Sequence, residues 1–192
     1  MLQHPVYCTS TKTALTTDGA GSDCFPSQAR LLFLRNINLY AKRSVGGYDT
    51  RHMIFHGCRA TKTSLSNVLS PFPPLETVVF FELEIDDLAS VLIALPTPIR
   101  RVHILEHSFR MSTNTPLVLP RLESFTYTFL SSWGRAPRIP ADDEADAEAL
   151  AEVQQAIESI LDAPQCTFKY LRSTRSPKDA LVDALAALKL DL

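Results

Sequence analysis

The residues with the clearest potential for chemistry lie in the segment H-I-L-E-H at 103–107. Its H-x-x-E-H order is that of one zinc-peptidase class, in which two histidines bind zinc and the glutamate activates water. This chemistry needs a helix, because a helix places both histidines on one face. The proline at 98 and the β-branched residues after it predict a strand, on which His103 and His107 would lie about 13 Å apart, too far to bind one ion. A metal-dependent hydrolase using His103, Glu106 and His107 is therefore the alternative function.

Two other groups of reactive side chains favour structural roles. His52, His56 and Cys58 form a cluster, but Gly57 and its loop-like flanks argue against the helix that would bring the two histidines together. The segment 142–158 holds seven acids and no base, which is typical of a solvated helix start stabilised by the macrodipole. The sequence has no phosphate-binding glycine loop and no G-x-S-x-G motif. We therefore predict a protein that is not an enzyme, with no catalytic residue, metal or cofactor.

The composition is that of one globular domain with no general attraction for nucleic acid or membranes. The chain has 192 residues, 45% of them hydrophobic, and a net charge of −2. Chains of about 100–200 residues usually form a single domain. A stretch at 30–62 holds seven Lys or Arg against one acid, but it matches no nucleic-acid-binding motif. The charge balance thus predicts neither a nucleic acid nor a membrane as partner.

The cysteine content indicates a reducing compartment. The four cysteines are far apart, and no two form a C-x-x-C pair. The first residues also lack the basic start and apolar run of a signal peptide. These features predict reduced thiols in a cytoplasmic or nuclear protein.

Hydrophobic periodicity predicts a polar arm followed by alternating strands and helices. Residues 1–28 are rich in Ser, Thr, Gly and Asp and predict a mobile N-terminal arm, and residues 29–192 predict a single domain. The last helix is expected to cover the exposed edge of the sheet. The predicted strands are 31–40, 53–55, 75–83, one from 99, 122–129 and 167–172. The predicted helices are 65–69, 86–95, 142–163 and one from 177.

Several predicted strands begin at a regular spacing. Leu75, Ile99, Leu122 and Phe168 are separated by 24, 23 and 46 residues, and the last interval is twice 23. Leucine-rich repeats are about 20–29 residues long, with an L-x-x-L-x-L strand. The triplets that fit this template are Leu75/Val78/Phe80, Ile99/Val102/Ile104 and Leu122/Phe125/Tyr127, with Phe168/Leu171 as a partial match and Leu34/Ile37/Leu39 out of phase.

This spacing predicts an α/β fold: an irregular leucine-rich-repeat-like stack, with a parallel sheet and helices on its convex side. Each unit is too small to bury its own apolar face, and stacking merges those faces into one core. Parallel neighbours require crossovers, which the helices at 86–95 and 142–163 supply. The alternative is a plain α/β domain whose strands happen to fall 23–24 residues apart.

Over residues 75–172 the chain resembles the irregular leucine-rich-repeat regions of fungal F-box-like proteins. The triplets carry this resemblance, together with the motif P-x-L-E, which occurs at 73–76 and again at 120–123. The chain has no F-box segment, so the resemblance concerns the repeat region alone. It implies a non-catalytic protein-protein interaction module, of the kind that recognises substrates for F-box proteins.

The repeat template also predicts a binding surface. In L-x-x-L-x-L the named residues point into the core and the residues between them point outward, because strand side chains alternate. Stacked strands would align the outward residues into a band suited to a protein or peptide partner. Val79 and Phe81 could instead be buried beneath the N-terminal arm. The predicted partner-binding residues are Thr77, Phe81, Arg101, His103, Leu105, Ser124, Thr126, Thr128, Tyr170 and Arg172.

Overall fold

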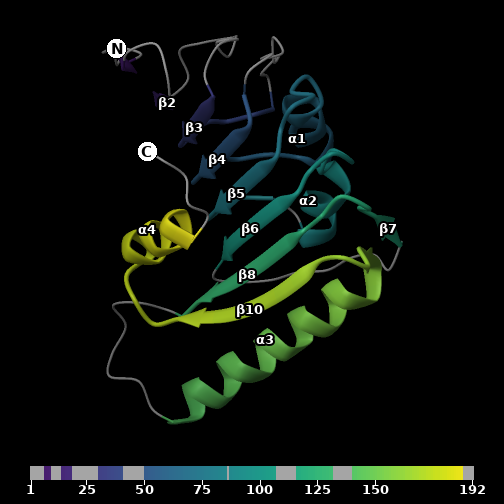
Figure 1. The fold of residues 1–192 in the computed structure, drawn as a ribbon. Helices are drawn as coiled ribbons and strands as arrows, with labels where there is room; N and C mark the ends of the chain where they lie inside the picture. Colours follow the sequence, from purple (N-terminus) through teal and green to yellow (C-terminus); the bar gives the residue numbers. More distant parts are fainter. Residues whose placement is uncertain are drawn as a thin grey trace.

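The computed structural model describes residues 7–9, 14–18, 30–40, 50–85, 87–106, 116–131 and 140–187. Its strands form one main sheet whose strand order follows the chain order (Figure 1). In that order they are β1 (Tyr7–Thr9), β2 (Ala14–Asp18), β3 (Leu31–Arg35), β4 (His52–His56), β5 (Thr77–Phe81), β6 (Arg101–Glu106), β8 (Ser124–Leu130) and β10 (Thr167–Ser173). A small second sheet pairs β7 (Leu117–Val118) with β9 (Leu161–Asp162). The helices are α1 (Lys62–Leu69), α2 (Leu88–Ala94), α3 (Pro140–Ile160) and α4 (Pro177–Ala187).

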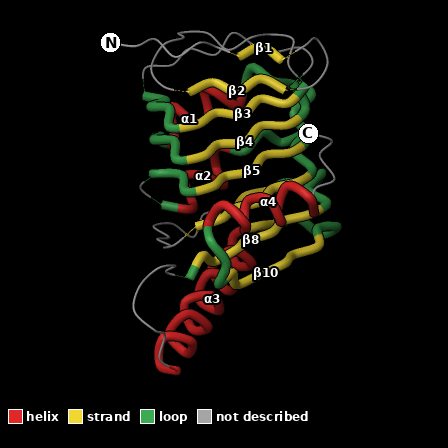
Figure 2. The backbone as a smooth tube through the Cα atoms, turned by 90° about the vertical axis from the view of Figure 1, so that its left-hand side faces the viewer, coloured by secondary structure: helices red, strands yellow, loops and turns green. Residues whose placement is uncertain are grey.

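The pairing in the main sheet is parallel except between β1 and β2, which are antiparallel. The predicted α/β class and parallel sheet are therefore confirmed. Figure 2 shows the strands stacked one above another. Within residues 1–28, predicted to be a mobile arm, the structure describes β1 and β2, and β2 pairs with β3. The rest of that segment lies outside the described residues.

The parallel register aligns the hydrophobic side chains of successive strands into rows. Val78 on β5 lies between Met53 on β4 and Val102 on β6. The row continues through Phe125 on β8 to Phe168 on β10. These side chains pack with those of α1, α2 and α3 in the larger core cluster. We call this side of the sheet the α1–α3 face.

The strands β3, β4 and β5 are followed by the same backbone bend. Asn36, Gly57 and Glu82 have φ values of 52°, 59° and 51°, in the left-handed region that L-residues rarely adopt. Each of the three donates its N–H to a carbonyl on the next strand, at 2.8, 2.9 and 3.0 Å respectively. The sheet ladder therefore continues through the bend, and it places successive loops in equivalent positions.

Exposed ion pairs join successive units at equivalent positions. Residues just before β4 and β6 pair with residues just before β5 and β8, and a third pair follows the bends after β4 and β5. Exposed pairs contribute at most about 1 kcal/mol each, so their main effect is to favour one register. The pairs are Arg51–Glu76, Arg59–Glu84 and Arg100–Glu123, with nitrogen–oxygen distances of 2.7, 2.5 and 3.1 Å.

Two helices of the α1–α3 face, α1 and α2, begin at well-formed caps. Thr61 and Ser64 form a capping box on α1, in which each side-chain oxygen accepts the other residue's backbone N–H, at 3.1 and 2.8 Å. Asp87 caps α2, because its carboxylate accepts the N–H of Ser90 at 2.8 Å. Such caps satisfy donors that the first helical turn leaves open. Each cap thus defines the residue at which the loop after a strand ends and the helix over the sheet begins.

The position of α4 differs from the prediction. It was expected to cover the edge of the sheet, but it lies on the sheet face opposite α1 and α2 (Figures 1 and 2). Leu181 and Leu185 of α4 form a second buried cluster with residues of the sheet, among them Phe81 and Leu105. We call this side of the sheet the α4 face. The sheet is thus covered by helices on both sides, not on one side alone.

Gly57→Ala is expected to lower the free energy of unfolding by about 1–2 kcal/mol, the cost of a left-handed conformation for an L-residue. The added Cβ would also stand 2.6 Å from Oδ1 of Asn36. Gly57→Asn brings the same Cβ to the same place, but asparagine tolerates the left-handed region better and should cost less. Urea denaturation of both variants measures the difference. Equal losses would show that the contact with Asn36, and not the backbone angle, sets the cost.

Leu181→Ala should lower the free energy of unfolding by about 2–3 kcal/mol, because it removes buried methyl groups from the α4 face. Val182 is the matched control on the same helix, since it is 58% exposed while Leu181 is 8% exposed. Val182→Ala should change stability by less than about 0.5 kcal/mol. Thermal and chemical denaturation test both variants. Similar small effects would contradict the packing of α4 on the sheet.

Candidate functional site

Part of the predicted binding band is buried. Thr77, Phe81 and Leu105 are 0%, 2% and 0% exposed, so their predicted partner contacts are wrong for this arrangement. Phe81 and Leu105 are covered because they belong to the cluster with α4. Val79 is buried in the same cluster, so the burial foreseen for Val79 and Phe81 is found, but against α4.

Two other predicted contacts lie on the wrong side of the sheet. Tyr170 is aligned with Tyr127 and packs against the core of the α1–α3 face. Arg172 is on the same side, where its guanidinium forms ion pairs with Asp143 and Asp146 of α3. The prediction took Phe168 as the first residue of the triplet, but the register places it at the second position. These two positions are three residues apart, and a shift by an odd number of residues moves every side chain of a strand to the opposite face.

The other predicted residues do gather on the α4 face. Arg101, Ser124 and Thr126 are partly exposed, whereas His103 and Thr128 are buried. The register also brings three exposed side chains of β10 to this face, which the prediction missed. We call the exposed and partly exposed residues of β8 and β10 on this face the β8–β10 strip: Ser124, Thr126, Thr167, Lys169, Leu171 and Ser173.

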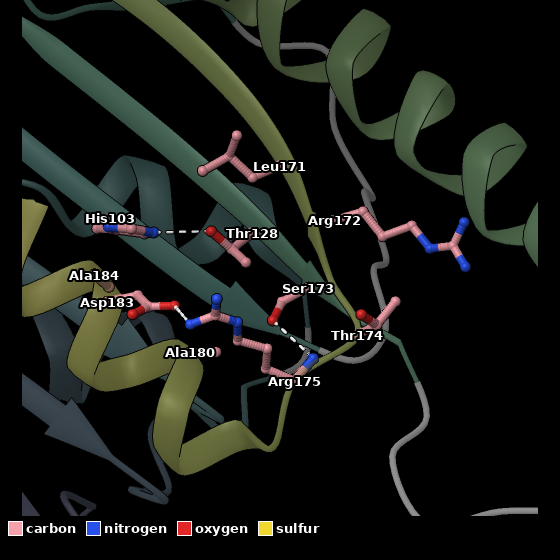
Figure 3. Close-up of a pocket in the computed structure, with 10 residues that line it drawn as sticks. All are labelled: His103, Thr128, Leu171, Arg172, Ser173, Thr174, Arg175, Ala180, Asp183 and Ala184. Atoms are coloured by element: carbon pink, nitrogen blue, oxygen red, sulfur yellow. Dashed lines mark hydrogen bonds and ion pairs between the residues drawn. The ribbon is translucent and has the colours of Figure 1, made fainter.

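A hollow of about 340 Å³ lies where α4 meets the sheet, and we call it the α4 groove (Figure 3). His103 and Thr128 stand on its sheet side, with His103 Nε2 2.9 Å from Thr128 Oγ1. Arg175 pairs with Asp183 at 2.9 Å on the other side. Arg172 borders the groove, but its side chain points away from it (Figure 3). The lining residues are His103, Thr128, Leu171, Arg172, Ser173, Thr174, Arg175, Ala180, Asp183 and Ala184.

Burial determines the protonation of His103. It lowers the pKa of the imidazole from 6.5 to about 4, so the ring is neutral at physiological pH. A neutral imidazole has one donor and one acceptor nitrogen. Its hydrogen bond to Thr128 therefore suits the polar floor of a binding site.

The hydrolase alternative receives no support from the positions of its residues. His103 faces α4, but Glu106 lies three residues along the same strand and so points to the other face. There Glu106 accepts the N–H of Leu83 at 2.8 Å, and burial raises its pKa to about 8. His107 lies outside the described residues. In the described ranges no three His, Cys, Asp or Glu side chains are grouped to hold a metal ion.

The second predicted cluster is also structural. His52 and His56 are at opposite ends of strand β4. Cys58 is buried beyond the bend, where its thiol donates to the carbonyl of Leu34 at a sulfur–oxygen distance of 3.4 Å. Burial raises the pKa of this thiol, which keeps it protonated as a donor.

Comparisons with family models, curated proteins and solved structures find no match for this chain. None of the helices in the described ranges has the length and hydrophobicity needed to cross a bilayer. The site must therefore be interpreted from its own geometry.

The pKa of His103 predicts an acid-side loss of stability. Because the folded-state pKa of about 4 is below the unfolded value of 6.5, the unfolded chain binds more protons between these values. The stabilising contribution is complete above pH 6.5 and falls toward pH 4, by at most about 1.4 kcal/mol per pH unit.

His103→Gln should remove this pH-dependent contribution to the free energy of unfolding while keeping a polar partner for Thr128. Denaturation of both proteins at several pH values between 4 and 7.5 gives the difference in unfolding free energy. A difference that is constant over this range would show that His103 is not buried in its neutral form.

Proposed function

We propose that this chain is a non-catalytic protein-interaction module, built as an irregular leucine-rich-repeat-like stack, which binds a protein or peptide through the α4 groove and the β8–β10 strip. The resemblance to the repeat regions of F-box-like proteins suggests substrate recognition as its role. The observation that carries the proposal is the strip itself: an exposed leucine among hydroxyl and cationic side chains, beside a groove.

The repeat interpretation is supported by features that recur at equivalent positions. The intervals between the left-handed residues Asn36, Gly57 and Glu82 are 21 and 25 residues, within the length of leucine-rich repeats. Cys58 follows Phe55 by three residues, where the template has asparagine or cysteine. Its hydrogen bond to Leu34 links two neighbouring units, as a residue at that position should.

The binding interpretation is supported by the composition of the surface. Leu171 is 47% exposed at the mouth of the α4 groove, and Lys169, two residues earlier on β10, is aligned with Thr126 on β8. Cores of interfaces combine apolar anchors with polar groups that fix orientation. A partner that covers Leu171 would remove apolar surface from water, and the hydroxyls and Lys169 would determine which partner fits.

A peptide selection tests this function. Phage display of random peptides against the immobilised protein should enrich a family of sequences, whose affinities are then measured in solution by fluorescence anisotropy. Leu171→Asp should weaken binding about tenfold, since it places a charge where an apolar anchor packs. Val182→Asp is the control, because Val182 is even more exposed than Leu171 but is not among the residues that line the groove.

The proposal fails if no sequence family is enriched. It also fails if the enriched peptides bind both variants as well as the unchanged protein. Circular dichroism and melting temperatures of the two variants establish that each remains folded before affinities are compared.

A further inference from the structure

The last strand of the sheet, β10, has no further strand paired along its outer edge in the described part of the chain. The N–H of Thr167 donates to the Glu123 carbonyl at 2.9 Å, and Ser131 donates to the Ser173 carbonyl at 3.0 Å. In a parallel pair, the backbone groups of every second residue point to the neighbouring strand, so the odd-numbered residues of β10 bond to β8. The backbone groups of residues 168, 170 and 172 therefore point away from the sheet. No strand in the described part of the chain pairs with them.

The side chains beside this edge on the α4 face are cationic, hydroxyl and apolar. Thr167, Lys169 and Leu171 are exposed in succession along β10, and the strand residues of β8 and β10 on this face include no carboxylate. An added strand would place its own side chains directly opposite these, at the distance at which cross-strand pairs interact.

Lys169 contrasts with three arginines at this end of the molecule, which do have carboxylate partners. Arg100, Arg172 and Arg175 each have a carboxylate partner, on Glu123, on α3 and on Asp183 respectively. Lys169 is exposed and makes no ion pair within the described residues. The only charged side chain of β10 on this face thus lies on a strand edge that no described strand covers, and no described acid forms an ion pair with it.

We propose that an extended acidic segment of the protein partner adds to β10 as a further parallel or antiparallel strand. Its backbone would bond to residues 168, 170 and 172, a carboxylate would face Lys169, and an apolar side chain two residues away would face Leu171. Alternate residues of an extended chain repeat at about 6.6–6.8 Å, which matches the spacing of Lys169 and Leu171 along β10. This mode of binding uses main-chain bonds for affinity and alternate side chains for selectivity. It rests on the proposed function and specifies the chemistry of the partner.

The test uses synthetic peptides with two changes that separate charge from backbone pairing. One set presents Glu or Lys at the position two residues from a leucine, in an otherwise Thr- and Val-rich sequence. The Glu peptide should bind about fivefold more tightly than the Lys peptide, the effect of one good cross-strand charge pair. Lys169→Glu should reverse this preference. Lys62→Glu is the control, because Lys62 is an exposed lysine on α1, on the other side of the sheet.

The second change is backbone N-methylation of the Glu peptide, at either of two neighbouring residues. Only one of the two N–H groups can face β10, so one methylated peptide should lose binding and the other should retain it. Hydrogen exchange followed by NMR should show slower exchange at the amides of residues 168, 170 and 172 when the Glu peptide is bound.

The inference is overturned if the Glu and Lys peptides bind equally well and neither N-methylated peptide loses binding. If such peptides still depend on Leu171, the proposed function stands and the binding mode is wrong. Slow exchange of the same three amides without peptide, rising with protein concentration, would show that a second copy of the chain occupies the edge, which also overturns the inference. If Leu171→Asp loses all peptide binding and the unchanged protein prefers the Glu peptide, both the proposed function and the strand-addition mode are supported.

Discussion

The in-register pairing of parallel strands is the constraint on which the rest of this structure depends. Once Val78 lies beside Met53 and Val102, the period of two along each strand determines the face of every other strand residue. Successive crossovers must then begin and end at equivalent points. The left-handed bends at Asn36, Gly57 and Glu82 allow this, because they carry the hydrogen-bond ladder out of the strand and into the loop.

The two faces of the sheet are buried in different ways, and this difference creates the candidate site. On the α1–α3 face, helices between the strands cover each row as the chain proceeds. On the α4 face, cover comes from one helix at the end of the described chain. A single short helix does not span the whole sheet, so β8 and β10 keep exposed side chains where α4 ends. The α4 groove lies at that boundary.

Burial also changes the chemistry of the ionisable residues near the site. His103 is held neutral and Glu106 is held protonated up to about pH 8, because the low-dielectric interior disfavours both charged forms. They are neighbours in the sequence motif, but they stand on opposite sides of one strand. Each is satisfied locally, His103 by Thr128 and Glu106 by the backbone of Leu83. Their shifted pKa values therefore reflect packing in the sheet and not a shared catalytic centre.

The sequence by itself determined the order and type of the main elements and the parallel arrangement. Spacings such as that from Leu75 to Ile99 are local, and prolines and caps mark the ends of the elements. It also placed His103 and Thr128 on one face, because each is adjacent in its strand to a template residue that points into the core. The register of β10 required the structure. Phe168 and Leu171 fit the first two positions of the template, and only the pairing with β8 shows that this alignment is wrong.

The position of α4 likewise depended on the tertiary structure. The sequence of an amphipathic helix shows which of its faces is apolar, but it does not show which surface of the protein that face covers. In the structure Leu181 and Leu185 pack on the face of the sheet, in one cluster with Phe81 and Leu105. The sequence thus determined the main strands and helices and the facing of most strand residues, whereas only long-range packing decided the facing of β10 and which residues remained open to a partner.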